Sequence, residues 1–323
     1  MLKPMRIGFL GAGYVARRHA KALVEGDLAE VVGVVDPLLE ARAEFGRVVS
    51  RPVDAYATVH DLLAQARPDA VWVCLPPDQR GEPELRLVEL GVPFFAEKPL
   101  AVNLEVARDI ATAVEQSGVT TAVGYHWRHL SGIRIAQEQL ASRLVHLAVA
   151  QWHDGLPGQS WWATRERSGG QVVEQLTHLL DVCRLFMGEP VGLGGMEVAR
   201  PTTAALSRGG DVPAATAGVV AFQNGGVASV SCSYAMHRRH RVQIELISDE
   251  LSLVLSEEDL TVTGPGEVRR YSEEADVFSS EVQNFLEAIR EGRPVVMSYA
   301  EALKSHELAV KLAEASRLPS PRG

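Results

Sequence analysis

The stretch RIGFLGAGYVA, residues 6–16, decides the first part of the fold. Arg6 to Leu10 is a short apolar strand candidate, and Gly11 and Gly13 follow it directly before a helical pattern. A strand, a G-x-G-x-x-A loop and a helix in this order are typical of a dinucleotide-binding unit. The first glycine permits the tight turn, the second lets the backbone approach a pyrophosphate, and Ala16 is small enough for close helix–strand packing. The helix N-terminus then faces the phosphates. The residues expected to hold the dinucleotide are Gly11, Gly13, Tyr14, Val15 and Ala16.

The second strand candidate, Ala29 to Val35, ends at Asp36. An acid about 20 residues after the glycine loop accepts hydrogen bonds from the ribose hydroxyls of NAD. A carboxylate there also repels the 2′-phosphate of NADP. Asp36 therefore predicts NAD, with NADP as the alternative because Arg42 lies nearby. The competing interpretation of Asp36 is a surface turn formed with Pro37.

Apolar strands and helices alternate along the first part of the chain. Strands that are apolar throughout, as at 70–75, are typical of a parallel sheet covered on both faces. From about residue 125, longer strand candidates alternate polar with apolar residues, as in VASVSCSY at 227–234. That pattern suits a largely antiparallel sheet with one face covered. The sequence predicts an α/β plus α+β protein, with a doubly wound parallel Rossmann domain at 1–123 that binds the dinucleotide and a second domain at 124–323.

Composition excludes several classes of protein. The chain has 323 residues and a net charge of −9, so electrostatics predict neither nucleic acid nor an anionic membrane as a partner. No apolar run approaches ~20 residues and no signal peptide is recognisable at the N-terminus. The three cysteines are scattered, which favours a reducing cytoplasm. The H-x-x-H pairs at 126–129 and 237–240 lack a third ligand at a known spacing, so no metal is expected.

Residues 94–100, FFAEKPL, place two charges at the end of a buried strand. Pro99 cannot continue a central strand because it has no N–H to donate. Glu97 and Lys98 are therefore delivered to a fixed position, and each needs a partner if it is buried. His19, on the first helix, is expected to be solvated or to cap that helix.

A polar stripe marks the helical pattern in SGGQVVEQLTHLLD, residues 168–181. Gln171, Glu174, His178 and Asp181 recur at three- and four-residue spacing and so share one helix face. Glu174 lies one turn before His178 and can orient its ring, which suits a general base that takes a proton from an alcohol. The alternative is an amphipathic surface helix with a chance histidine.

Two weaker signals precede this helix. Tyr125 and Arg128 open the second domain, and ordinary linker polarity is one interpretation of them. Trp161 and Trp162 with Arg165 form an aromatic platform beside a cation, which suits a sugar face. The alternative for this second group is a packed loop.

Five motifs together resemble the glucose-fructose oxidoreductase / inositol dehydrogenase / rhizopine catabolism (Gfo/Idh/MocA) family over nearly the whole chain. They are GAGYVA at 11–16, LPP at 75–77, AEKPLA at 96–101, GYHWR at 124–128 and SGGQVVEQLTHLLD at 168–181. The resemblance implies a Rossmann domain followed by an α+β domain on an open, mostly antiparallel sheet. In this family the sheet face commonly forms the oligomer interface, so a homodimer or homotetramer is expected.

The resemblance also implies roles for the first set of residues. Leu75 and Pro76 of the LPP turn would contact the cofactor. Lys98 would lie near nicotinamide and substrate, after a turn held by Glu97 near the cofactor ribose. A cis peptide is expected between Lys98 and Pro99, since relatives often have one.

For the helix, the resemblance makes His178 the acid/base. Glu174 stands where the family usually has aspartate, and Leu176 stands where it usually has glycine, so substrate geometry is expected to differ from that of inositol dehydrogenases. Asp181 matches an acid seen in relatives and is a candidate structural residue.

The predicted function is NAD(P)-dependent hydride transfer between a secondary alcohol of a sugar or cyclitol and nicotinamide. The expected catalytic residues are Lys98, His178 and Glu174. The expected substrate-binding residues are Lys98, Tyr125, Arg128, Trp162, Glu174 and His178. The alternatives are a reductase of another carbonyl or imine with tightly bound cofactor, and a non-catalytic NAD-binding regulator.

Overall fold

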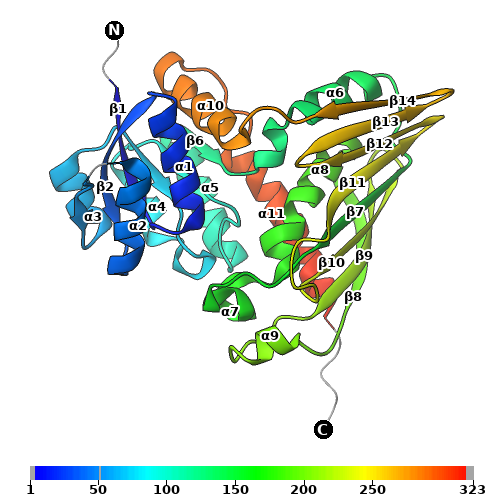
Figure 1. Cartoon of the computed structure of the whole chain (residues 1–323), viewed down its shortest axis with the longest axis horizontal. Helices are drawn as coiled ribbons and strands as arrows, with labels where there is room; N and C mark the ends of the chain where they lie inside the picture. The colour runs from blue at the N-terminus through cyan, green and yellow to red at the C-terminus, as the bar shows by residue number, and fades with distance from the viewer. Residues whose placement is uncertain (1–3, 51, 318–323) are drawn as a thin grey trace. The chain divides into compact units, whose positions relative to one another are not determined.

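The computed structural model describes residues 4–50 and 52–317 (Figure 1). Internal contacts divide the chain into two units. The first is Met1–His129 with Ala275–Leu303, and the second is Leu130–Glu274 with Lys304–Gly323. The segment 275–303, assigned from sequence to the second domain, thus belongs to the first unit. Apolar side chains of its helix α10 (Val277–Glu291) complete one of the first unit's cores.

The first unit contains a six-stranded parallel sheet in the order β3-β2-β1-β4-β5-β6. Its strands are β1 (Met5–Leu10), β2 (Ala29–Val35), β3 (Ala55–Tyr56), β4 (Ala70–Val73), β5 (Phe94–Ala96) and β6 (Thr121–Val123). The predicted Rossmann sheet is confirmed. In such sheets ligands bind outside the carboxyl ends of the strands where the strand order reverses, which here is at β1 and β4.

Two apolar cores cover the two faces of this sheet. One core joins the sheet to α1 (Tyr14–Glu25), α2 (Leu39–Val49) and α10. The other joins it to a π-helical turn (Leu62–Ala66), α4 (Glu82–Glu89) and α5 (Leu104–Ser117). Shorter helical segments are α3 (Val59–Asp61) and the 3₁₀ turns Pro77–Gln79 and His126–His129. Covering helices on both faces explain why the central strands are apolar throughout.

The second unit contains an eight-stranded sheet in the order β14-β13-β12-β11-β7-β10-β9-β8. Only the β7–β10 pair is parallel, so the predicted mostly antiparallel sheet is confirmed. Its strands are β7 (Leu147–His153), β8 (Pro190–Glu197), β9 (Ala215–Phe222), β10 (Val227–Ser233), β11 (Arg241–Ser248), β12 (Leu251–Ser256), β13 (Asp259–Gly264) and β14 (Glu267–Ser272). The last three were not predicted from the sequence.

Helices cover one face of this sheet. In Figure 1, α8 (Thr177–Met187) and the later part of α11 (Tyr299–Ala315) lie along it, and Leu312 of α11 approaches Gly218 of β9. Strand β11 shows the consequence, because its residues alternate between buried and partly exposed along its length. The remaining helices of this unit are α6 (Ser131–Leu140), the 3₁₀ turn Ser160–Ala163, α7 (Arg165–Ser168), a π-helical turn (Val172–Leu176) and α9 (Thr203–Leu206).

Candidate functional site

The glycine loop joins β1 to α1, and its two glycines are needed for different reasons. Gly11 has a φ of +92°, and a Cβ added there would lie 2.6 Å from the carbonyl oxygen of Cys74. Backbone conformation and packing both require glycine at that position. Gly13 has a φ of −67°, which any residue can adopt, and a Cβ there would meet no described atom within 4 Å. The space beside Gly13 is what the approach of a pyrophosphate requires.

The start of α1 is suited to an anion. The helix has no side-chain cap and no acidic residue in its first turn. Its first N–H groups and the positive end of its dipole are therefore suited to an anionic ligand. Tyr14 is exposed and its hydroxyl accepts a hydrogen bond from Arg18 (3.1 Å). Val15 is half-buried, and Ala16 is fully buried, as its predicted packing role requires.

Gly13→Ala tests whether this space belongs to the cofactor. The added methyl group fits the folded protein, so the midpoint of thermal unfolding should stay unchanged. It would occupy the space of a pyrophosphate, so we expect NADH affinity to fall by ~10-fold or more, about 1.4 kcal/mol. Titration of NADH fluorescence measures this. Gly158→Ala, at another glycine with open space around it, is the matched control; equal affinities in both variants would contradict the assignment.

Asp36 follows β2 and holds the glycine loop in place. Its Oδ2 accepts the N–H of Ala12 and its Oδ1 accepts the N–H of Leu38, both at 2.8 Å. Asp36 is therefore a turn residue, as the competing interpretation proposed. Each carboxylate oxygen has a second lone pair, so ribose hydroxyls can bind the same group.

Asp36→Ala separates these two roles. Damage to the loop would weaken NAD and NADP equally. Loss of a ribose acceptor that also repels a 2′-phosphate would weaken NAD more than NADP. We expect the second result, measured as the ratio of the two dissociation constants; an unchanged ratio would leave Asp36 as a turn residue only.

A buried ion pair ties the LPP turn to the end of β5. Arg80 donates to the carbonyl oxygens of Leu75 (3.1 Å) and Glu97 (2.6 Å) and to the carboxylate of Glu84 (3.0 Å). The Arg80 and Glu84 side chains are almost completely buried, while Leu75 and Pro76 are half-buried. The sequence interpretation missed this pair; its only local sign is the i,i+4 spacing across a helix start.

The buried acid of the E-K-P turn (residues 97–99), Glu97, is paired with His19. His19 is fully buried, contrary to the expectation that it is solvated or caps its helix, and its Nε2 lies 2.7 Å from Oε1 of Glu97. Oε2 of Glu97 accepts the N–H of Lys98 at 3.2 Å. The expected cis peptide between Lys98 and Pro99 is confirmed. Lys98 itself is half-buried.

Glu97 is a carboxylate at neutral pH. Burial by itself would raise its pKa, but the hydrogen bond from His19 and the charges of His19, Lys98 and His126 lower the pKa below its usual value. A carboxylate can only accept hydrogen bonds, so Nε2 of His19 carries the hydrogen that it donates.

Tyr125 and Arg128 lie after β6 in the first unit. Tyr125 is fully buried among apolar side chains of one core, which favours a packing role. Arg128 forms an ion pair with Glu301 at 3.6 Å, and only 11% of its side chain is exposed. Their contact with substrate stays a prediction.

In the second unit, the helix of the polar stripe begins irregularly. Gly169 and Gly170 have φ values of +78° and +87°, a conformation that favours glycine. The π-helical turn Val172–Leu176 follows and leads into α8. Single π turns within helices are frequent at functional sites, because they change which side chains share a face.

The polar stripe is buried. Gln171, Glu174, His178 and Asp181 are 2%, 1%, 3% and 0% exposed. The surface-helix alternative is therefore wrong, since a solvated face would leave these side chains in water. Each of these four buried polar groups must be compensated by a partner.

Gln171 and Asp181 are held by structural partners. The amide of Gln171 donates to the carbonyl oxygens of Trp152 (3.3 Å) and Ser233 (3.1 Å). Asp181 accepts from the hydroxyl of Ser305 at 2.6 Å. These contacts anchor the helix to neighbouring elements. The catalytic roles expected of Glu174 and His178 stay predictions.

His178 and Glu174 lie in an aromatic environment. The His178 ring stacks on Trp152 of β7 with centroids 5.6 Å apart and an interplanar angle of 21°. Burial raises the pKa of Tyr234 well above its usual value, and the nearby charge of Glu174 adds to this effect, so the phenol stays protonated. Neither Trp152 nor Tyr234 was predicted, because nothing in their sequence spacing connects them to the helix.

The predicted aromatic platform is a stacked pair of tryptophans, but the neighbouring cation, Arg165, is paired with an acid. Trp161 and Trp162 stack with centroids 4.9 Å apart, and Trp162 packs against the small core that contains Tyr234. Arg165 instead donates to both carboxylate oxygens of Glu197, at 2.9 and 3.0 Å. The structure thus brings Trp162 near the Tyr234 core and assigns Arg165 to an ion pair.

Two family profiles match the chain. The GFO/IDH/MocA oxidoreductase family profile for the NAD-binding Rossmann fold matches residues 5–125. The GFO/IDH/MocA C-terminal domain profile matches residues 135–254. The chain belongs to the GFO/IDH/MocA family. The residues of the glycine loop and the E-K-P turn lie within the part that matches the NAD-binding Rossmann profile.

Relatives of this GFO/IDH/MocA protein are distant. The rhizopine catabolism protein MocA of Rhizobium meliloti is 26% identical over 57% of this chain, and the match spans little more than half (57%) of that relative. Inositol 2-dehydrogenase of Rhizobium meliloti is 26% identical over 94% of both chains. A structure of levoglucosan dehydrogenase with NADH and levoglucosan shares the fold, with a TM-score of 0.84, 18% identity and 97% coverage of both chains.

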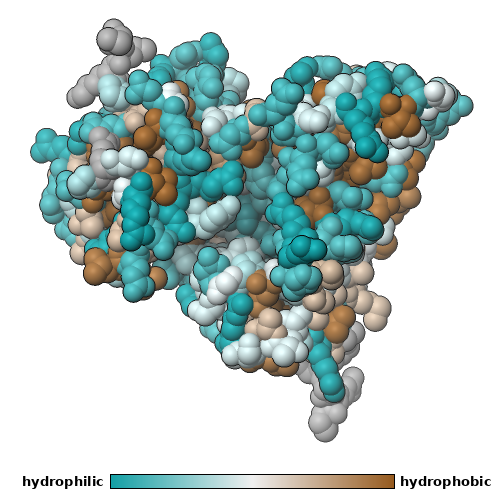
Figure 2. Space-filling view, in the orientation of Figure 1, coloured by the Kyte–Doolittle hydropathy of each residue, from teal (hydrophilic) through white to brown (hydrophobic). Residues whose placement is uncertain are grey.

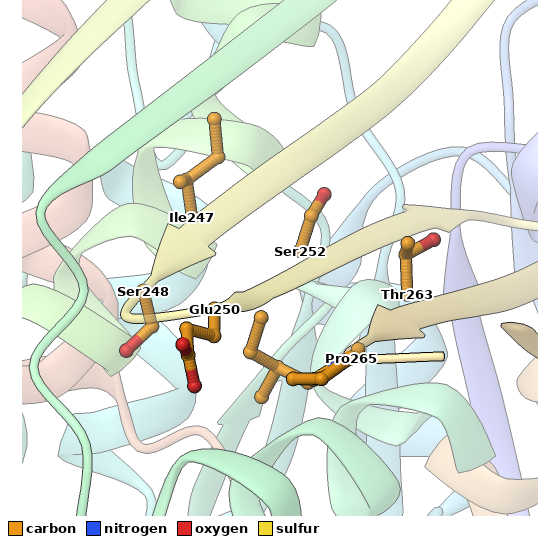
Figure 3. A pocket seen from close by; sticks show the side chains of 8 residues that line it. Ile247, Ser248, Glu250, Ser252, Thr263 and Pro265 are labelled. Atoms are coloured by element: carbon orange, nitrogen blue, oxygen red, sulfur yellow. The ribbon is translucent and has the colours of Figure 1, made fainter. Parts of the chain in front are cut away.

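No metal-binding cluster and no membrane span is found in the described part of the GFO/IDH/MocA chain, but a pocket is. Within residues 4–50 and 52–317, no cluster of three His, Cys, Asp or Glu side chains could hold a metal ion, and no helix is long and apolar enough to cross a membrane. Figure 3 shows an open pocket at the β11–β12 turn. None of the predicted site residues lines it; the labelled side chains are Ile247, Ser248, Glu250, Ser252, Thr263 and Pro265.

Proposed function

We propose that this protein is an NAD-dependent dehydrogenase that oxidises a secondary alcohol of a sugar or cyclitol, or reduces the corresponding ketone. The first unit binds the cofactor and contributes Lys98, and the second unit contributes His178 and Glu174. Relatives that carry sugar and inositol dehydrogenase names support this substrate class.

The glycine loop, the N-terminus of α1 and Asp36 would hold NAD, which when bound accepts or returns a hydride at its nicotinamide ring. His178 takes the hydroxyl proton as the alcohol becomes a carbonyl, and gives it back in the reverse direction. Lys98 stabilises the negative charge that develops on the same oxygen. Glu174 orients His178 and the substrate. General acid–base catalysis contributes ~10²–10⁴ in rate, and positioning supplies much of the rest.

One observation carries the proposal: the family-motif residues Glu174 and His178 are both buried, one helical turn apart on the same helix. Burying a potential charge costs several kcal/mol unless it is compensated, so a fold that keeps both groups there has a use for them. A regulator that only binds NAD needs neither group.

The test is reduced-nicotinamide absorbance with purified protein, NAD or NADP, and a panel of cyclitols, aldoses, amino sugars and sugar acids. Turnover of a ring alcohol supports the proposal. Turnover of carbonyls or imines alone, by protein that retains cofactor through purification, supports the reductase alternative. NAD binding without turnover on any panel member supports the regulator.

We also propose that the outer face of the second unit's sheet binds another copy of the chain. Apolar side chains gather along this sheet (Figure 2). Met196 of β8, Val219 of β9 and Val227 of β10 are 68%, 54% and 41% exposed, and the strand registers place them on one face. Such a contiguous exposed patch marks an interface. Sedimentation velocity tests this: a dimer or tetramer is expected, and a monomer would contradict it.

A further inference from the structure

Glu281 is a buried acid of the first unit that the proposed reaction does not use. It lies on α10 and is 1% exposed, and neither of its carboxyl oxygens has a hydrogen-bond partner within the described ranges. A carboxylate at such a position would lose its hydration with no compensation. The neutral acid is the form that this environment tolerates.

Glu281 lies on the face of α10 that packs on the sheet of the first unit. Phe278, Glu281 and Phe285 are three and four residues apart and so share one face of α10. The Phe278 ring lies 5.0 Å from the His19 ring, and the Phe285 ring lies 5.3 Å from that of Trp72. Glu281 therefore sits between the contacts that α10 makes with α1 and with β4.

Two acids thus share this region and only one of them is charged. Burial, then the charges of Glu97 and Asp276, raise the pKa of Glu281 well above its usual value. The pKa of Glu97 moves the opposite way, because Glu97 has the hydrogen bond from His19. Two neighbouring carboxylates in a dry site cannot both ionise cheaply.

The other titratable groups around Glu281 are consistent with a neutral Glu281 beside an ionised Glu97. Cys74, after β4, has its pKa raised by burial and then by the charge of Glu97, so it stays a neutral thiol. His126, on the 3₁₀ turn that packs on α10, stacks on Phe278 with centroids 5.9 Å apart. Arg18 of α1 lies over the Phe278 ring and forms an ion pair with Asp276.

We propose that Glu281 is a positioning residue: as a neutral acid it keeps Glu97 the single carboxylate of this buried group, bound to His19 and to the N–H of Lys98. The E-K-P turn then holds one geometry, and Lys98 is presented from it. This inference rests on the proposed function, in which Lys98 acts on the substrate.

The proposal fixes a sign for the pH dependence of stability. The unfolded chain loses the Glu281 proton above a pKa of about 4.3, whereas the folded chain keeps it. The unfolded state then binds fewer protons, so this acid lowers stability as pH rises from that value toward the folded pKa. Glu281→Gln imitates the neutral acid and has no proton to lose.

The experiment compares wild type, Glu281→Gln and the matched control Glu287→Gln, which changes a more exposed acid on the same helix. Unfolding midpoints are measured from about pH 5 to about pH 9. We expect Glu281→Gln to gain stability over wild type progressively as pH rises, and Glu287→Gln to show no such trend. A pH-independent difference for Glu281→Gln would overturn the proposal.

A second readout tests positioning without any substrate. The ring N–H that His19 donates to Glu97 is followed by NMR and assigned by its loss in His19→Gln. We expect this signal to persist to higher pH in Glu281→Gln than in wild type. Any fall of kcat at alkaline pH should then begin at a higher pH in the variant as well. If the signal disappears at the same pH in both proteins, Glu281 is only a packing residue. If wild type has no turnover, the proposed function fails while the NMR result still judges Glu281.

Discussion

His178→Ala is expected to lower kcat by ~10²–10⁴-fold, because the substrate hydroxyl loses its general base. NADH affinity should stay within about twofold of wild type, since the glycine loop and Asp36 belong to the other unit. Steady-state kinetics with the substrate found in the panel, together with an NADH titration, measure both quantities.

The control for this variant is His146→Ala. His146 is a half-exposed histidine of the same unit that pairs with Asp249 at 3.0 Å. Its removal should change neither kcat nor NADH affinity. His178 also packs on Trp152, so the unfolding midpoint of His178→Ala must be recorded. A fall in rate matched by an equal fall in cofactor affinity would remove His178 from the chemistry.

Lys98→Ala is expected to lower kcat by ~10²–10³-fold, the usual cost of removing one group that stabilises developing charge on oxygen. Lys98→Arg should not restore the rate, because a planar guanidinium cannot take the position of a compact ammonium. The backbone N–H of Lys98 still bonds Glu97 in both variants, so the turn itself should survive.

Lys21→Ala is the matched control for Lys98. Lys21 is an exposed lysine of α1 whose nearest acid, Glu25, is 3.7 Å away. The Lys21→Ala substitution removes the same charge from the same unit and leaves the E-K-P turn unchanged. If Lys98→Arg works as well as wild type, Lys98 supplies only a distant positive charge and the assigned role is wrong.

Local sequence was sufficient for the first half of the cofactor site. Gly11 has a positive φ and lies close to the carbonyl oxygen of Cys74. The strand–glycine–helix order of the motif predicts both features, because the tight turn there requires glycine. The stripe from Gln171 to Asp181 was also predictable as part of one helix from its three- and four-residue spacing, but the π-helical turn within it was not predicted. That the stripe is buried was not predictable, because burial depends on what covers it.

Partners that are distant in sequence could not be predicted. His19 and Glu97 are 78 residues apart, and nothing in either local pattern announces a 2.7 Å hydrogen bond. The return of α10 to the first unit was missed for the same reason. An amphipathic helix shows that it has an apolar face, but not which sheet that face will cover.

The sequence by itself determined the alternation of strands and helices in the Rossmann part, the dinucleotide motif and the polar residue types of the helix at 171–181. These follow from turn conformation and side-chain period, which act over a few residues. Tertiary structure alone decided the partners and the directions of the pKa shifts: the hydrogen bond from His19 lowers the pKa of Glu97, burial raises the pKa of Glu281, and Asp181 is anchored to Ser305. Burial and electrostatic pairing are sums over everything packed around a group, and that set of neighbours exists only in the folded chain.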